Sequence, residues 1–427
     1  MNALVIFTLL AVLMLTGMPI SISLGLTVLT FLFTMTDVPL ESVALKLFTG
    51  IEKFEIMAIP FFILAGNFLT HGGVAKRMIN FATSMVGHWY GGLGLAGVLA
   101  CALFAAVSGS SPATVVAIGS ILLPAMVKAG FPNKFGAGVI ATSGALGILI
   151  PPSIVMVMYS VATNTSVGAL FMAGVIPGLA LAGVLGAVTW YRAKKFDYPR
   201  QPKATWGERW KAFRASVWGL LLIGVVMGGI YTGIFTPTEA AAMSAVYAFI
   251  CAVFIYKDLG LKDVPKVLLN SANMSAMLLY IITNAVLFSF IMTNENIPQA
   301  LADWMLGNGL GIITFLLAVN VILLLAGNFM EPSSIVLIFA PILFPVAIAL
   351  GIHPVHFGIL MVVNMEVGMC HPPVGLNLYV ASGITKMGIT ELTVAVWPWL
   401  LSMLGFLMVV TYWPDLSLWL PRTMGML

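Results

Sequence analysis

The sequence predicts an all-α polytopic membrane protein built from two related halves. Hydrophobic residues make up 60% of its 427 residues and charged residues only 8%, whereas a soluble globular chain carries about 25% charged residues. The apolar residues fall in long stretches, and a membrane-spanning helix needs about 20 of them. Proline motifs of the first half also recur in the second half. These three observations exclude a soluble enzyme and a disordered protein.

The remaining composition narrows the function further. The net charge is only +4, and the basic residues form no aromatic-interleaved patch of the kind that binds nucleic acid. Cys101, Cys251 and Cys370 lie far apart in apolar runs, so we interpret them as buried small hydrophobic residues rather than metal ligands or disulfides. The N-terminus has no basic n-region, and we therefore predict a first span rather than a removed signal peptide.

Ten apolar segments are predicted to cross the membrane in chain order. They are 3–17, 19–35, 56–70, 133–163, 167–190, 217–235, 238–256, 270–292, 356–382 and 394–413. Two further stretches, 90–128 and 309–348, are each interrupted at mid-depth by small polar residues. We expect each to form a re-entrant hairpin, because irregular backbone at membrane depth is tolerated only where it is buried or lines a cavity. Two crossings in place of either hairpin would leave the later orientation unchanged.

Charge sets the expected orientation. The segment 191–216 holds eight Lys and Arg against two acidic residues, so the positive-inside rule makes it a cytoplasmic linker. Ten spans and two hairpins then place 16 of the 19 basic residues inside and leave Lys46, Lys53 and Arg422 outside. Both termini are predicted to be periplasmic. Two mixed segments, 42–54 and 297–306, suit helices lying on the outer interface.

The two halves form a predicted inverted repeat. The first repeat, 1–190, contains the hairpin 90–128 and a broken helix 133–163. The second repeat, 217–427, contains the hairpin 309–348 and a broken helix 356–382. The diproline at 151–152 recurs at 372–373, and Pro124 recurs at Pro345, both 221 residues later. Five spans per half put the second repeat in the opposite orientation, as in secondary transporters whose sites lie where the broken helices meet.

The two diproline steps carry the first part of the predicted site. Proline has no N–H and its ring disfavours a continued helix, so the carbonyl groups before each step lose their helical partners. Because such carbonyls carry partial negative charge, a small cation can satisfy them. The predicted helix breaks are Pro151, Pro152, Pro372 and Pro373, and the carbonyls before them include those of Gly147, Ile150, Gly368 and His371. A lone proline more often marks a packing kink, but two steps at one register indicate function.

The hairpin tips carry the second part. Hydroxyl and amide groups cluster where a helix begins, and a helix N-terminus favours an anion. In the two tips these groups belong to Ser108, Ser110, Ser111 and Thr114, and to Asn328, Ser333 and Ser334. The alternative for each group is a capping or packing role. Glu239 and Glu331 are interpreted as N-terminal capping residues, whereas Glu366 lies in an apolar run where pairing, ion tuning and proton carriage remain open.

Four motifs stand out together: SGSSPAT at 108–114, GILIPPS at 147–153, GIFTPTEAAA at 233–242 and HPPVGLN at 371–377. With them the sequence resembles, over essentially its whole length, the large membrane subunit of the tripartite ATP-independent periplasmic (TRAP) transporters. This resemblance implies an elevator-type secondary transporter in a bacterial or archaeal inner membrane, driven by Na⁺ and using no other cofactor. It also implies two partners, a small four-helix membrane subunit, expected as a separate chain, and a periplasmic substrate-binding protein.

The resemblance implies the Na⁺ ligands, whereas the hydroxyl and amide groups themselves predict the contacts with the substrate. The Na⁺ ligands carried over onto this sequence are Ser108, Ser111, Gly147, Ile150, Gly327, Asn328, Gly368 and His371. The residues expected to contact the substrate are Ser110, Thr114, Ser153, Ser333, Ser334 and Asn377. The substrate class is an organic anion, with a C4-dicarboxylate expected first and another carboxylate such as sialic acid next.

Three alternatives remain at the level of the sequence. A stand-alone Na⁺/dicarboxylate or citrate symporter shares the plan of hairpins and breaks. An intramembrane hydrolase would use Ser110 or Ser111 with His371, although these residues alone do not define a nucleophile geometry. A channel would show downhill flux without saturation. The sequence favours a transporter that is not an enzyme.

Overall fold

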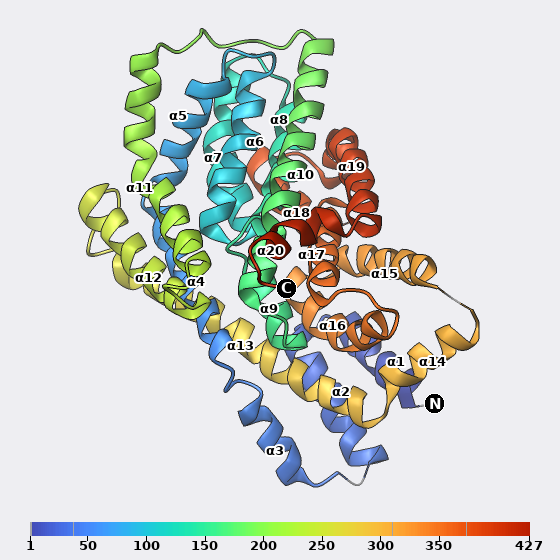
Figure 1. Ribbon diagram of the computed structural model, residues 1–427. Helices are drawn as coiled ribbons and strands as arrows, with labels where there is room; N and C mark the ends of the chain where they lie inside the picture. Colours follow the sequence, from blue (N-terminus) through green and yellow to red (C-terminus); the bar gives the residue numbers. More distant parts are fainter. Residues whose placement is uncertain (1, 37, 310, 373) are drawn as a thin grey trace.

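The computed structural model describes residues 2–36, 38–309, 311–372 and 374–427, and within these ranges the regular elements are all helical (Figure 1). The elements of the first half are α1 (Asn2–Leu15), α2 (Ile20–Met35), α3 (Leu40–Thr49), η1 (Phe54–Met57), α4 (Ala58–His71), α5 (Val74–Val86), α6 (Gly92–Ser108), α7 (Ser111–Lys128), α8 (Asn133–Ser143), η2 (Gly144–Ile148), α9 (Ile154–Thr163) and α10 (Val167–Lys195). The elements of the second half are α11 (Trp206–Tyr231), α12 (Pro237–Ile250), the π-turn η3 (Cys251–Ile255), α13 (Val264–Asn294), α14 (Ile297–Gly307), α15 (Ile312–Gly327), α16 (Pro332–Ala349), α17 (Pro354–Cys370), α18 (Leu376–Thr385), α19 (Ile389–Tyr412) and α20 (Asp415–Thr423).

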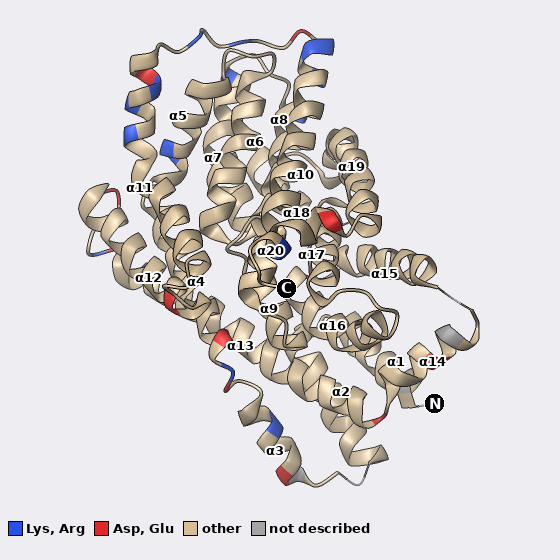
Figure 2. Cartoon of the chain, viewed as in Figure 1, with Lys and Arg blue, Asp and Glu red and all other residues tan. Residues whose placement is uncertain are grey.

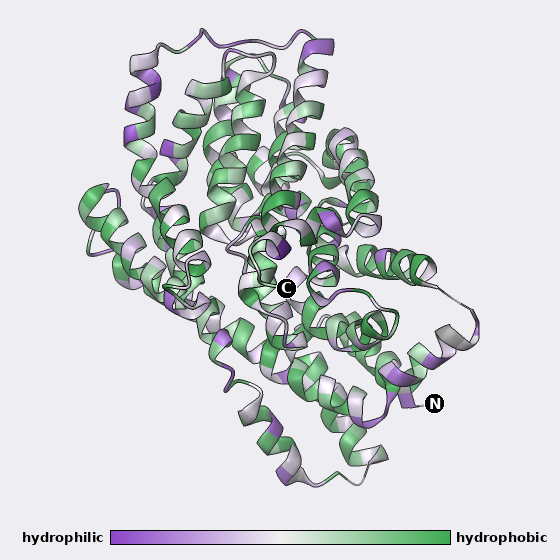
Figure 3. Cartoon of the chain, in the orientation of Figure 1, coloured by the Kyte–Doolittle hydropathy of each residue, from purple (hydrophilic) through white to green (hydrophobic). Residues whose placement is uncertain are grey.

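The helices are long and apolar enough for a polytopic membrane protein. Among the described residues, eight helical segments satisfy the length and hydropathy of a membrane span, and six shorter apolar helices accompany them. Apolar colouring runs along most helices in Figure 3, and α13 leaves Leu269, Met277 and Tyr280 about half exposed. Exposed apolar area on this scale needs a lipid or protein environment. The predicted all-α membrane fold is therefore confirmed.

Local sequence explains where several helices begin. Thr205 and Thr236 each accept a hydrogen bond from the backbone N–H three residues later, and the carboxylates of Glu208 and Glu239 each accept one from the backbone N–H of the cap residue. These two capping boxes start α11 and α12. The predicted capping role of Glu239 is thus confirmed. Helices α7, α13, α16 and α17 each have proline at the first or second helical position. Proline suits this position because its missing N–H would have no helical partner there.

The structure adds elements that the apolar pattern did not predict. Helix α5 carries Lys76 and Arg77 and is too short and polar to qualify as a span, so it was missed. Helix α20 was missed for the same reason. The ends of the segment 191–216 are helical, since α10 continues to Lys195 and α11 begins at Trp206. The two segments expected at the outer interface, 42–54 and 297–306, overlap α3 and α14.

Five consecutive helices recur in the same order in the second half. Helices α6, α7, α8, α9 and α10 begin at residues 92, 111, 133, 154 and 167, and α15 to α19 begin at 312, 332, 354, 376 and 389. The offset therefore stays between 220 and 222 residues across the hairpin, the broken helix and the helix that follows. The duplicated proline motifs thus mark a duplicated order of helices.

The helices form two groups that pack against each other. We call α1–α5 with α11–α14 the frame, in which α4 packs against α12 and α13, and α5 packs against α11. We call α6–α10 with α15–α20 the hairpin unit, in which α7 packs against α8 and α18, and α19 packs against α8 and α10. Figure 1 shows the long α13 running beneath the upright helices of the hairpin unit.

Basic residues gather at one end of the molecule. Figure 2 shows Lys and Arg concentrated at the top, over the end of α10, the connection to α11 and the start of α11. This end contains the segment 191–216, where the sequence places its strongest positive excess. We refer to it below as the basic end.

Candidate functional site

The first hairpin tip touches the first helix break. The tip between α6 and α7 turns at Gly109, whose φ of 60° lies in the left-handed region that glycine adopts freely. A Cβ on Gly109 would lie 3.0 Å from the carbonyl oxygen of Pro152, and a Cβ on Gly147 would lie 2.6 Å from that of Ser110. Glycine at both positions therefore lets the backbone of the tip approach the backbone of the break.

Hydroxyl groups of this tip are buried and hydrogen-bonded to nearby backbone. The Oγ of Ser111 donates to the carbonyl of Gly144 over 2.9 Å, which fixes α7 to the turn before the break. The Oγ1 of Thr114 lies 2.9 Å from the Oγ of Ser108 and donates to the carbonyl of Ser110 over 2.8 Å. The three hydroxyl groups thus surround the first tip.

The second tip meets the second break in the same way. A Cβ on Gly327, at the end of α15, would lie 2.9 Å from the Cα of Gly368 in α17. The Oδ1 of Asn328 lies 3.2 Å from the Nδ1 of His371, and its Nδ2 donates to Leu324 over 3.3 Å. Helix α17 ends at Cys370 and α18 begins at Leu376. The predicted break at Pro372 is therefore present, whereas Pro373 lies outside the described residues.

Asn377 is one of several side chains that join the two halves. The Nδ2 of Asn377, in α18, donates to the Oγ of Ser111 over 2.8 Å and to the carbonyl of Ala141 over 3.3 Å. Its Oδ1 is buried and has no hydrogen-bond partner among the described residues. The Oγ of Ser334, in the second hairpin, is buried and unpartnered within the same ranges. A buried oxygen atom without a hydrogen bond is costly. Neutral oxygen atoms of this kind are suitable ligands for a small hard cation.

A cavity of about 340 Å³ lies between the two tips and the frame. The hairpin unit contributes both tips and both break regions, and the frame contributes α4 and α13. Its described lining includes Asn67, Thr70, Gly109, Ser110, Ser111, Pro112, Ile148, Met274, Met277, Glu331, Pro332, Ser333, Met369 and Leu376. The N-terminal ends of α7 and α16 therefore both reach the cavity, and each presents free N–H groups.

The geometry sorts the residues predicted to contact the substrate. Ser110 and Ser333 line the cavity, whereas Thr114, Ser153, Ser334 and Asn377 are not among its described lining residues. Ser153 instead caps α9 by accepting from the backbone N–H of Met156 over 3.4 Å. Hydroxyl content alone therefore did not separate cavity residues from those that hold the backbone around it. Ile150, a predicted Na⁺ ligand, packs its side chain beside Gly178 of α10.

Three cavity residues were missed by the sequence reasoning. Asn67 and Thr70 lie in the last turns of α4, and Asn67 donates to the Oγ of Ser271 in α13 over 2.8 Å. A lone amide in an otherwise apolar span was the available signal. Glu331 was expected to cap α16, but it makes no side-chain capping bond there. Its buried Oε1 is without a hydrogen-bond partner in the described ranges, and the residue faces the cavity.

The acidic and metal-ligating groups outside the cavity form no further centre. Glu366 is fully buried in α17, and both of its oxygen atoms lack hydrogen-bond partners within the described parts of the chain. The same parts hold no cluster of three His, Cys, Asp or Glu residues that could bind a metal ion. A cation at the tips would therefore be held mainly by carbonyl, hydroxyl and amide oxygens. Neither Ser110 nor Ser111 hydrogen-bonds to His371, whose Nδ1 instead pairs with Asn328.

Removing the first break should change ion binding. Replacing Pro151 and Pro152 together by alanine supplies two N–H groups and allows the helix to continue between η2 and α9. The carbonyls before the step would then find helical partners. We expect an at least tenfold weaker dependence of transport on the coupling ion, measured by ion titration of uptake. Replacing Pro398, inside α19, by alanine is the matched control; equal titrations for both variants and the parent would contradict the role of the break.

Comparison with known proteins gives a consistent family. Residues 7–416 match the family model described as the tripartite ATP-independent periplasmic transporter, DctM component. The chain is 77% identical to a C4-dicarboxylate TRAP transporter large permease protein of Rhodobacter capsulatus, with all of both chains covered. It is 54% identical to a protein of the same description in Pseudomonas aeruginosa and 36% identical to a sialic acid TRAP transporter large permease protein of Vibrio cholerae, each over 95% of both chains.

A solved structure shares the fold. The chain resembles the YdaH transporter of Alcanivorax borkumensis with a TM-score of 0.61 and 15% sequence identity, over 88% of both chains. At this identity the likeness concerns the arrangement of helices alone.

Proposed function

This chain belongs to the DctM family of tripartite ATP-independent periplasmic transporters, and from this premise we propose that it imports a C4-dicarboxylate together with Na⁺. Members of the family are permeases and not enzymes, so the hydrolase alternative is set aside. The large permease works in a tripartite system. Its partners here would be a separate small four-helix membrane subunit and a periplasmic binding protein that delivers the substrate. The basic end would face the cytoplasm and both termini the periplasm.

The observation that carries the proposal is the cavity between the two tips. Two helix N-termini and the hydroxyls of Ser110 and Ser333 face one space of about 340 Å³. This volume is at the lower end of the range of about 300–1,000 Å³ for small-molecule sites. A C4-dicarboxylate has two carboxylate groups, and each could meet the positive end of one helix, α7 or α16. Relatives named for C4-dicarboxylates support this substrate class.

Bound Na⁺ would balance the negative charge that a dicarboxylate brings to this site. The described lining contains no Lys or Arg and one acidic residue, Glu331. A dianion beside this carboxylate is unfavourable unless cations are bound nearby. The carbonyl, hydroxyl and amide oxygens beside the cavity supply suitable ligands. Movement of the hairpin unit relative to the frame would then carry the substrate and the ions together across the membrane.

The proposal can be tested in liposomes. The chain would be reconstituted with its small subunit, and uptake of radiolabelled succinate would be followed with an inward Na⁺ gradient and the binding protein outside. We expect uptake that saturates, requires Na⁺ and requires the binding protein. Equal uptake without the binding protein would instead indicate a stand-alone symporter, and uptake without Na⁺ would reject the coupling.

Asn328 is expected to contribute to Na⁺ binding. Its side chain lies at the second tip, with Oδ1 3.2 Å from the Nδ1 of His371. Replacement by alanine removes this oxygen, and we expect the Na⁺ concentration for half-maximal uptake to rise about tenfold, which corresponds to about 1.4 kcal/mol. Asn308→Ala, at an exposed position with a local hydrogen bond to Trp304, is the control. An unchanged Na⁺ titration for Asn328→Ala would remove this residue from the ion site.

A further inference from the structure

Within the described residues, one polar link joins the frame and the hairpin unit, which otherwise meet through packed helices. Among the side-chain hydrogen bonds and ion pairs between residues that the structure describes, only those of Lys53 join the two units. Lys53 lies in the frame, just before η1 and α4. The other contacts between the units, α5 and α4 against α6 and α13 and α14 against α16 among them, are made by packed helices. An interface of this kind can shift with little loss of hydrogen bonding, except at Lys53.

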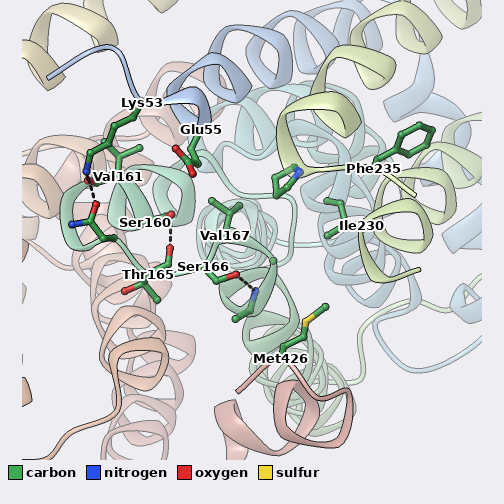
Figure 4. Close-up of a pocket in the computed structure, with 14 residues that line it drawn as sticks. Lys53, Glu55, Ser160, Val161, Thr165, Ser166, Val167, Ile230, Phe235 and Met426 are labelled. Atoms are coloured by element: carbon green, nitrogen blue, oxygen red, sulfur yellow. Dashed lines mark hydrogen bonds between the residues drawn. The ribbon is translucent and has the colours of Figure 1, made fainter. Parts of the chain in front are cut away.

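Lys53 caps the end of a helix in the hairpin unit. Its Nζ donates to the carbonyl of Val161 over 2.6 Å and to the Oδ1 of Asn164 over 2.7 Å (Figure 4). Helix α9 ends at Thr163, and Asn164 follows it in the left-handed conformation with a φ of 56°. The last carbonyls of a helix carry partial negative charge and lack helical partners. A cationic amine therefore satisfies this end both by hydrogen bonding and by charge.

The link lies at the edge of a hollow between the units. Lys53, Val161 and Asn164 help to line this cavity of about 490 Å³, together with Glu55, Ile230 and Phe235 from the frame and residues around the start of α10 from the hairpin unit. Figure 4 shows Lys53 reaching across toward Val161 while Phe235 and Ile230 lie on the opposite side. Because the space around the lysine is open, the two units can separate here without disrupting a packed core.

The position of the candidate substrate cavity shows toward which side of the membrane the hairpin unit is directed when Lys53 is bonded to it. That cavity contacts the frame at Asn67 and Thr70, in the last turns of α4, and at Met274 and Met277, in the first half of α13. These parts of α4 and α13 are the ones that adjoin the basic residues of α5 and of the connection before α13. Lys53 precedes the opposite end of α4. The cavity thus lies toward the cytoplasmic end of the frame in the proposed orientation, and Lys53 contacts the hairpin unit at the other end.

We propose that Lys53 is a reversible latch that holds the hairpin unit in this cytoplasm-directed position, and that the latch opens each time the unit moves outward. The inference rests on the proposed transport function, because only a transporter needs the unit to move. The latch consists of one ammonium group, which donates hydrogen bonds to a carbonyl at the end of α9 and to the side-chain amide oxygen of Asn164.

The energetics suit a latch that opens. Partial burial lowers the pKa of Lys53, and the nearby charge of Glu55 opposes that shift. Desolvation of the amine therefore offsets part of the gain from its two hydrogen bonds. A link of moderate net strength biases the position of the unit without locking it.

The test measures the position of the hairpin unit directly. Cysteines would replace the exposed Ile234 in the frame and the exposed Trp419 in the hairpin unit, and donor and acceptor dyes would report their distance in single molecules of the full chain in lipid nanodiscs. The native cysteines are all buried. In the parent we expect one dominant distance. Lys53→Met should raise the population ratio of the second distance to the first about tenfold, and Asn164→Asp should lower it by adding a negative charge opposite the amine.

Matched controls separate the latch from general damage. Lys46→Met removes a lysine from α3 that lies over the ring of Phe290, also in the frame, and should leave the distribution unchanged. Melting temperatures would be compared for all variants. The latch is refuted if Lys53→Met and Lys46→Met give the parent's distribution, or if Asn164→Asp shifts it in the same direction as Lys53→Met. The distance measurement needs neither substrate nor binding protein, so its outcome is independent of the uptake assay that tests the proposed function.

Discussion

Replacing Gly147 by alanine is expected to abolish Na⁺-dependent uptake. A Cβ at this position would lie 2.6 Å from the carbonyl oxygen of Ser110 and 2.7 Å from the Cα of Ser111. Both atoms belong to backbone, which cannot move aside as the end of a flexible side chain can. Overpacking of this kind typically costs about 1–3 kcal/mol, and here it would push the first tip away from the break. We expect uptake to fall by more than tenfold, together with a lower melting temperature.

A glycine elsewhere in the same unit provides the control for this prediction. At Gly383, in α18, an added Cβ would have no atom of the described residues within 4 Å apart from its own helical backbone and chain neighbours. Since alanine favours helix over glycine by about 1 kcal/mol, Gly383→Ala should melt at the same or a higher temperature and transport normally. Uptake by Gly147→Ala at the parent's rate and Na⁺ dependence would show that the close approach of tip and break is not required.

Replacing Asn377 by alanine is expected to weaken the contact between the two repeats beside the first tip. The variant would leave the Oγ of Ser111 and the carbonyl of Ala141 without the donor that now joins them to α18. Both groups keep a second partner, Gly144 for Ser111 and Cys370 for Ala141, so the cost is that of two lost hydrogen bonds, about 0.5–1.5 kcal/mol each. We therefore expect a lower melting temperature and a loss of most Na⁺-dependent uptake. The measurement is a double-mutant cycle with Ser111→Ala, in which the two effects should be strongly non-additive.

A second asparagine, Asn133, provides the control for this double-mutant cycle. Asn133, at the start of α8, also contacts α18, but through a single longer bond of 3.5 Å to the carbonyl of Thr385. Asn133→Ala should change stability and uptake little. Additive effects of Asn377→Ala and Ser111→Ala, or equal losses for Asn377→Ala and Asn133→Ala, would show that the link between the repeats has no special role.

Features with local causes were predicted well from the sequence. Two prolines in succession prevent a helix from continuing whatever surrounds them, so the break at Pro151 and Pro152 follows from the residues alone. Apolar length in the same way predicts most of the helices, and Thr236 with Glu239 predicts a helix start. Helix α5 was missed because its basic residues and short length hide it from a criterion based on apolar length.

Contacts between distant segments could not be predicted in this way. Glu331 and Ser153 illustrate the limit, since both sit at helix starts, yet Ser153 caps its helix while Glu331 faces the cavity. A hydroxyl or carboxylate can satisfy its hydrogen bonds locally or present them to a ligand, and its neighbours in space decide which. Asn67 likewise became a cavity residue only because α4 packs beside the hairpin unit.

The sequence by itself thus determined a duplicated, all-helical membrane transporter with two tips and two breaks, because hydropathy and proline act along the chain. Only the tertiary structure decided which side chains share a space: Asn377 on Ser111, Gly327 against Gly368, and Lys53 on the end of α9. Each of these pairs joins residues that are far apart in sequence. Such contacts are fixed by the packing of whole helices, which no local pattern encodes.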